Sequence, residues 1–256
     1  MSSENKAIDL DDERYADIKD RASILAGINA GRKVVLVTYS LSEIMERQLD
    51  FVIAAILKFY ERPALQSTLY TCLKEIVVNA TRANAKKKFF DSQNLRIDDP
   101  EEYKRGNALM KEQMSEQWIE KYGGMAREAD LRVTIAIEHE PAGLRAWVIN
   151  DALLLSAEEA RIRERFADGM SYEDLVSFYM SNADQTEGAG MGLVMNLLLL
   201  KGENINPALF RIGMVDGKTT ARIEVPFTSE FKSVRGDDPG GFKERPDDIR
   251  LDYRRV

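Results

Sequence analysis

The chain has 256 residues, of which 44% are hydrophobic and 31% charged, and it carries a net charge of −7. These proportions are typical of a soluble globular protein large enough for one extended domain or two small ones. The acidic balance argues against a general nucleic-acid-binding protein, because phosphate contacts require a basic surface.

Cysteine and histidine each occur once, so they cannot build a zinc site between them. Cys72 lies in an apolar helical stretch and is expected to be a small buried side chain. No disulfide framework is possible within the chain, which fits a reducing cytoplasm. The acidic N-terminus has no signal-peptide core, and the longest apolar run, Phe51–Leu57, is too short to span a bilayer. We therefore expect a cytoplasmic protein without membrane insertion.

The first half of the chain is predicted to be mostly helical. Apolar residues recur at helical spacing over 10–30, and β-branched residues at 33–40 indicate a strand. Serine caps predict a helix over 42–60, and Pro63 begins another that ends near Phe90. After a polar break at 91–100, a charged helix is expected over 101–121, ending at the sequence YGG.

Strands and helices alternate in the second half. A hairpin is predicted from strands 131–140 and 144–150 with the turn PAG between them. Serine-capped helices are expected over 156–166 and 171–180. A glycine-rich loop at 186–193 leads into an apolar helix, and strands at 208–215 and 219–227 complete the chain up to a polar tail.

These elements suggest three parts. Residues 1–61 are expected to form an N-terminal segment of helices and a strand, whose helices 10–30 and 42–60 could pair in a homodimer. Residues 62–227 form the main domain, with a helical insertion at 94–125. Residues 228–256 are rich in glycine, proline and mixed charge, which predicts a flexible tail.

The helix that begins at Pro63 carries two polar residues on one face. Glu75 and Asn79 are four residues apart in the sequence KEIVVNATRANAKK. A carboxylate can act as a general base, and an amide oxygen is a hard ligand suited to Mg²⁺ beside phosphates. Two polar residues at the edge of an ordinary helix are the alternative interpretation. Lys86 and Lys87 follow, either to reach phosphates or to form a solvated basic face.

The second motif is the glycine-rich sequence TEGAGMGL. Gly188, Gly190 and Gly192 precede a helix, and backbone amides at a helix N-terminus favour phosphate. The sequence is neither a P-loop nor a dinucleotide fingerprint, because no Gly-Lys-Ser/Thr and no parallel βαβ unit follow. A glycine-rich turn without a ligand is the alternative.

The order of these motifs resembles the ATP-binding domain of the GHKL superfamily. EIVVNATRA is similar to the asparagine box of histidine kinases, GAGMGLVMNLLLLKGENI to their second glycine box, and DGKTTARIEVP to their closing strand, with Thr219 at the usual threonine. The resemblance covers roughly residues 64–227. It implies an α/β (α+β) two-layer sandwich of the histidine kinase-like ATPase (Bergerat) type, in which helices cover one face of a mostly antiparallel or mixed sheet. It also implies ATP and Mg²⁺ as ligands.

The first glycine box departs from the family pattern Asp-x-Gly-x-Gly. Asn150 falls at the position of the adenine-reading aspartate, with Asp151 beside it, and Ala152 and Leu154 replace both glycines. If Asn150 reads the base, its amide can donate as well as accept, so we expect a blunted preference for ATP over GTP. Asp151 is the alternative reader of the base.

No histidine precedes the asparagine box, and His139 is expected to be a surface residue on a strand. The chain therefore lacks the plan of a self-contained histidine kinase. The resemblance implies a protein of cytoplasmic signal transduction, either a kinase acting in trans or an ATP-gated switch, with another signalling protein as substrate or regulator. The alternative is a pseudo-ATPase that serves as a protein-binding module. A topoisomerase-like or repair ATPase is disfavoured, because no transducer domain follows.

Overall fold

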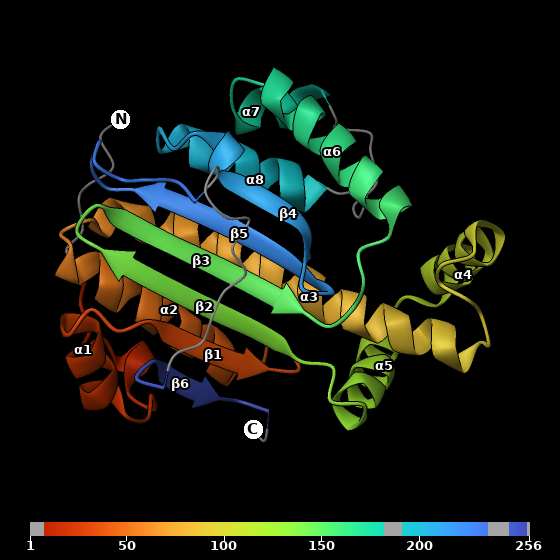
Figure 1. Ribbon diagram of the computed structural model, residues 1–256, viewed down its shortest axis with the longest axis horizontal. Coiled ribbons are helices and arrows are strands. Elements are labelled where there is room, and N and C mark those ends of the chain that lie inside the picture. The colour runs from red at the N-terminus through yellow and green to blue at the C-terminus, as the bar shows by residue number, and fades with distance from the viewer. Residues whose placement is uncertain (1–7, 182–190, 235–245, 255–256) are drawn as a thin grey trace.

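Six strands form one mixed sheet in the computed structural model, which describes residues 8–181, 191–234 and 246–254 (Figure 1). Their order is β4-β5-β3-β2-β1-β6, and every neighbouring pair is antiparallel except β1 and β6, which are parallel. The strands are β1 (Val34–Thr38), β2 (Val133–Glu140), β3 (Gly143–Asn150), β4 (Phe210–Val215), β5 (Lys218–Pro226) and β6 (Ile249–Asp252). The α+β architecture with a mixed, mainly antiparallel sheet is thus confirmed.

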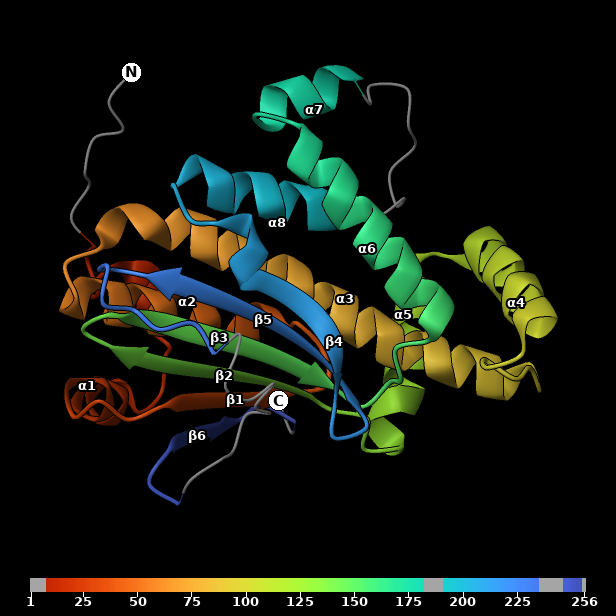
Figure 2. The same ribbon diagram turned by 45° about the horizontal axis from the view of Figure 1, so that its top comes forward.

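One face of the sheet is apolar and packs against helices. Alternate residues of β3, Leu144, Ala146 and Val148, enter the main core, as expected for a strand with period two. The helices against this core are α1 (Arg21–Asn29), α2 (Glu43–Phe59), α3 (Gln66–Ser92) and α8 (Met191–Gly202). Figure 2 shows α2 and α3 side by side on this face, with α8 lying over α3. The sheet and these helices make the two layers.

The opposite face of the sheet carries buried charges. Glu224 is 1% exposed, and its carboxylate forms an ion pair with the Arg222 guanidinium at 2.9 Å. The chain after β5 crosses this face, since the Val234 amide donates to Glu224 at 3.2 Å and the Arg145 guanidinium lies 4.6 Å from the Phe231 ring centroid. These contacts offset the free-energy cost of burying the charged groups, which would be high if they were unpaired.

The helical insertion forms a small core of its own at the far end of α3. It contains α4 (Pro100–Gln113) and α5 (Glu116–Glu128), and the aromatic residues Phe89, Phe90, Trp118 and Tyr122 pack together beneath them. Because α3 has 27 residues, it is about 40 Å long and extends beyond the sheet. The remaining helices, α6 (Ser156–Ser171) and α7 (Leu175–Ser181), precede α8. In the described part of the chain, no helix combines the length and apolar character needed to cross a membrane.

Several predicted boundaries need correction. Residues 8–61 are not a separate part, because β1 lies inside the sheet and α1 and α2 belong to the main core. The helix expected over 10–30 is shorter, since Asp20 has a left-handed φ of 59° immediately before α1. The helix expected over 101–121 is two helices, because Ser115 caps a new one, and α5 continues through the YGG sequence to Glu128.

The tail predicted over 228–256 also needs correction. Its residues 249–252 form β6, whose Ile249 amide donates to the Lys33 carbonyl at 2.8 Å. The Ile249 side chain lies against Gly27 of α1, where a methyl group would overlap it. The hydroxyl of Tyr253 donates to Gln48 of α2. The end of the described chain is thus anchored to both the sheet edge and the helical layer.

Candidate functional site

Glu75 and Asn79 interact with each other on α3. Both side chains are half-buried, and the Asn79 amide nitrogen donates to Glu75 Oε1 at 3.0 Å. A spacing of four residues places them one above the other on the helix, as predicted. This bond uses the amide nitrogen of Asn79 and leaves its amide oxygen available as an acceptor or ligand.

The glycine-rich sequence that precedes α8 meets α3 at this point. Gly192 lies at the start of α8 directly against Glu75, and a methyl group in place of its hydrogen would overlap the carboxylate. Two motifs far apart in the sequence are therefore brought into contact, and the contact depends on the absence of a side chain at Gly192. Gly188 and Gly190 lie outside the described residues.

Buried polar groups hold α8 to α3 beside this contact. Asn196 is fully buried and its amide nitrogen donates to the Cys72 carbonyl at 3.3 Å. Burial raises the pKa of the Cys72 thiol to about 12, which makes it unreactive. Cys72 is thus a buried structural residue, as predicted from its apolar surroundings.

Asn150 is turned toward α3. It is 3% exposed, and its amide nitrogen donates to Asn84 Oδ1 at 3.4 Å. The Ala152 amide donates to the same oxygen at 3.1 Å. The amide nitrogen, which was expected to be able to donate to a guanine carbonyl, is therefore directed at the protein's own helix.

Asn84 is a residue that the sequence analysis missed. It is fully buried, and its amide nitrogen donates to the carbonyls of Leu131 and Arg132 at 3.1 and 3.2 Å. One side chain of α3 thus holds both the entry to β2 and the loop after β3. The only signal in the sequence was a second asparagine, five residues after Asn79, among alanines.

Asp151 and Thr219 lie at the same loop but are engaged by the chain. Asp151 accepts from the Arg132 amide at 2.9 Å and from the Lys218 ammonium at 2.7 Å. Thr219 is the cross-strand neighbour of Asn150 and donates to the Ala152 carbonyl at 2.6 Å. The loop is therefore tied down by its neighbours on both sides.

Lys86 makes an ion pair within the protein. Its ammonium lies 2.8 Å from Glu158 Oε1 of α6, and its side chain is 14% exposed, which does not fit the solvated basic face. Burial by itself would raise the pKa of Glu158. The charge of Lys86 and the hydrogen bonds that the Glu158 carboxylate accepts outweigh this effect, so the pKa of Glu158 is lowered. The pair joins α3 to α6.

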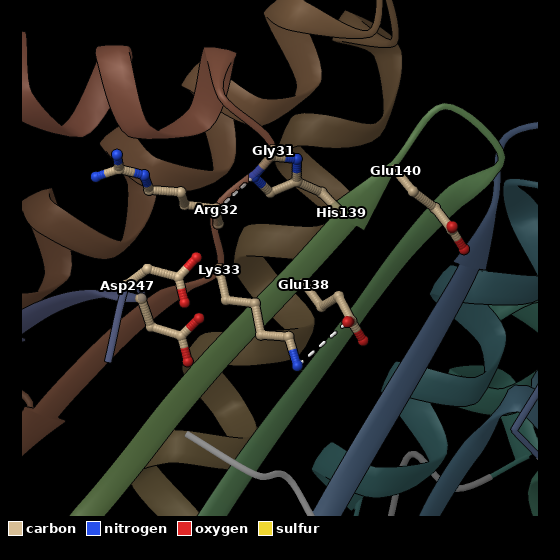
Figure 3. Close-up of a pocket in the computed structure, with 8 residues that line it drawn as sticks. Gly31, Arg32, Lys33, Glu138, His139, Glu140 and Asp247 are labelled. Carbon is tan, nitrogen blue, oxygen red and sulfur yellow. Dashed lines mark hydrogen bonds and ion pairs between the residues drawn. The ribbon is translucent and has the colours of Figure 1, made fainter. Parts of the chain in front are cut away.

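A polar pocket lies at the other end of the strands, near the turn between β2 and β3 (Figure 3). It is lined by Gly31, Arg32, Lys33, Glu138, His139, Glu140, Asp247 and Asp248. Figure 3 shows the Lys33 ammonium directed at Glu138, to which it is paired at 3.2 Å. His139 pairs with Leu144 at the hairpin end, whereas Asn150 pairs with Val133 at the opposite end. This pocket is therefore separate from the loop after β3.

His139 is buried rather than on the surface, which corrects the prediction. It is 5% exposed, and its Nε2 lies 2.9 Å from the Arg32 carbonyl, so Nε2 carries a proton and donates. Its Nδ1 lies 3.0 Å from the Tyr60 hydroxyl. Burial lowers the pKa of His139, against the opposing effects of the Arg32 carbonyl and Glu138. These contacts make it a satisfied neutral residue of the fold.

Among the described residues, no group of three or more His, Cys, Asp or Glu side chains is placed to hold a metal ion.

Comparisons with known proteins give one relative without a described function. The chain is 28% identical over 232 residues to an uncharacterized protein of Treponema pallidum (strain Nichols). The match covers 91% of this chain and 45% of the relative, so the chain spans less than half of that protein's length. No family model and no solved structure matches the chain.

Proposed function

We propose that this protein binds ATP with Mg²⁺ between α3 and the start of α8, and that it acts in signal transduction as a kinase in trans or as an ATP-gated switch. The observation that carries the proposal is the contact of Gly192 with Glu75 beside Asn79. An amide oxygen, a carboxylate and a helix N-terminus then lie within one small region. This combination suits a phosphate chain and its cation.

The residues of the site take separate roles in this proposal. Asn79 would hold the cation through its amide oxygen, and Glu75 would accept a proton from the attacking water or hydroxyl. Gly192, with Gly188 and Gly190, would let the backbone approach the phosphates. The cation, when bound, neutralises charge on the phosphates. A role of Asp151 and Thr219 at the base would follow from the resemblance alone.

The proposal is tested by the metal dependence of an Asn79→Asp variant. This change keeps the shape of the side chain but replaces a neutral ligand with a charged one, and its carboxylate loses the donor that bonds Glu75. We expect altered Mg²⁺ dependence of ATP binding with the fold retained, measured by calorimetry at several Mg²⁺ concentrations. Unchanged ATP affinity and unchanged Mg²⁺ dependence would make Asn79 a structural residue.

A pseudo-ATPase is the second candidate, and the loop after β3 favours it. Asn150 is turned to Asn84, Asp151 is paired with Lys218, and Ala152 is buried where the family has glycine. Such a protein would bind a signalling partner through the same fold without a nucleotide. Partner binding that is unaffected by ATP, together with no ATP binding at millimolar concentration, would favour this candidate over the first.

A further inference from the structure

Polar side chains from α3, α4 and α6 form a cluster, and α4 belongs to the insertion. Tyr103 of α4 donates its hydroxyl proton to Glu158 Oε1 of α6 at 2.8 Å. Lys86 of α3 donates to the Tyr103 hydroxyl at 2.9 Å and to the same Glu158 oxygen at 2.8 Å. Figure 2 shows the N-terminal end of α6 beside α3, with α4 nearby. The insertion is thus connected to the two helices that border the first glycine box.

The cluster is sheltered from solvent, so its contacts are stronger than those of a surface pair. The side chains of Lys86 and Glu158 are 14% and 25% exposed. The Lys86 ammonium also lies 4.3 Å from the centroid of the Tyr103 ring, which adds a cation–π contact. Charge-assisted hydrogen bonds of this kind are roughly twice as strong as neutral ones.

Glu158 also holds the loop of the first glycine box. Its second carboxylate oxygen accepts from the Leu155 amide at 3.2 Å, where the loop becomes α6. Asn84 holds the other end of the loop through the Ala152 amide. Residues 150–155 are therefore fixed at both ends by α3, directly through Asn84 and indirectly through Lys86 and Glu158.

We propose that the insertion controls the candidate nucleotide site through this cluster, with Tyr103 as a positioning residue for the loop 150–155 and the start of α6. Glu158 is the shared partner. One of its carboxylate oxygens accepts a hydrogen bond from Tyr103 of the insertion, and the other accepts one from the Leu155 amide of the loop. A movement of α4 that withdraws Tyr103 loosens the loop, and a ligand that orders the loop favours the docked α4. The effect on nucleotide binding rests on the proposed function, whereas the coupling of α4 to the loop does not.

The test is a Tyr103→Phe variant, because it removes only the hydroxyl. Tyr70→Phe is the matched control: the Tyr70 hydroxyl donates to Glu46 at 3.1 Å, and Lys74 pairs with the same oxygen at 2.7 Å, but this triad joins α2 to α3. The Tyr103 hydroxyl also accepts from Lys86 and Arg161, at 2.9 and 2.8 Å, so the variant loses these two bonds together with the one donated to Glu158. Only the bond to Glu158 reaches the residue that holds the loop, and its loss, about 1 kcal/mol, corresponds to about a fivefold change in an equilibrium constant.

We expect amide hydrogen exchange over residues 153–158 to become about fivefold faster in Tyr103→Phe and to stay unchanged in Tyr70→Phe. ATP affinity, measured by calorimetry with Mg²⁺, should fall by about fivefold in Tyr103→Phe alone. A purely structural role of Tyr103 in fixing α4 would speed exchange in α4 and leave residues 153–158 unchanged.

The outcomes separate this proposal from the proposed function. If the unaltered protein binds ATP and Tyr103→Phe binds it equally well with unchanged exchange at 153–158, the coupling is refuted and the function stands. If the unaltered protein binds no ATP, the function fails and hydrogen exchange alone decides. Faster exchange at 153–158 then supports control of the loop by the insertion, and unchanged exchange overturns it.

Discussion

Replacing Asn84 with alanine should destabilise the fold more than any other single truncation of an asparagine in α3 or α8. Asn84 makes four hydrogen bonds, two donated to the Leu131 and Arg132 carbonyls and two accepted from Ala152 and Asn150. The two donors of the loop are themselves buried. Leaving a buried donor without a partner costs about 1–3 kcal/mol.

The expected loss can be worked out from these contacts. The Ala152 amide contributes most, because its bond is 3.1 Å long and its residue is 5% exposed, whereas the 3.4 Å bond from Asn150 is weaker. Alanine has a higher helix propensity than asparagine, and this difference offsets about 0.5 kcal/mol of the loss. We therefore expect the free energy of unfolding to fall by about 3 kcal/mol, measured by urea denaturation with an unchanged m-value.

Asn196→Ala is the matched control, since Asn196 is equally buried on a helix. It donates one bond at 3.3 Å, and its amide oxygen has no hydrogen-bond partner among the residues that the structure describes. Its loss should cost about 1 kcal/mol or less. If Asn84→Ala costs no more than Asn196→Ala, the loop after β3 is not held by Asn84 and the inference drawn from it is wrong.

Three further changes have defined outcomes. Asn150→Asp places a carboxylate against Asn84 Oδ1 and removes the donor, so we expect a loss of about 2 kcal/mol in urea denaturation, and unchanged stability would show that Asn84 can reorient. The pKa of His139 is lowered in the fold, so near pH 6.5 and just below, the unfolded chain binds more protons than the folded chain. The free energy of unfolding therefore falls as the pH falls through this range. His139→Gln should remove this slope below about pH 6.5, and an identical slope would contradict the assignment. Gly192→Ala should displace Glu75 and weaken ATP binding by about tenfold. Gly202→Ala, at a position with open space, should leave ATP binding unchanged. Equal ATP affinities of the two variants would refute the close contact of Gly192 with Glu75.

Local patterns in the sequence predict much of the layered core. The β-branched run at 33–40 becomes β1, and the PAG turn joins β2 to β3 at the predicted place. The helical period puts Glu75 and Asn79 on one face, where they interact. These features depend on neighbouring residues, whose spacing is visible in the sequence.

Features that depend on distant partners could not be predicted in this way. β6 lies in a stretch of mixed charge and becomes a strand because β1 offers a free edge and Gly27 leaves room for Ile249. The burial of His139 depends on Tyr60, which comes from the end of α2. Asn84 takes its role from loops that only the fold brings to α3.

We propose above that ATP and Mg²⁺ bind between α3 and the start of α8. The most direct measurement is an isothermal titration of the full chain with ATP in the presence and absence of Mg²⁺, paired with thermal unfolding. We expect saturable binding that requires Mg²⁺ and raises the unfolding temperature. No heat of binding and no thermal shift at millimolar ATP would contradict the claim.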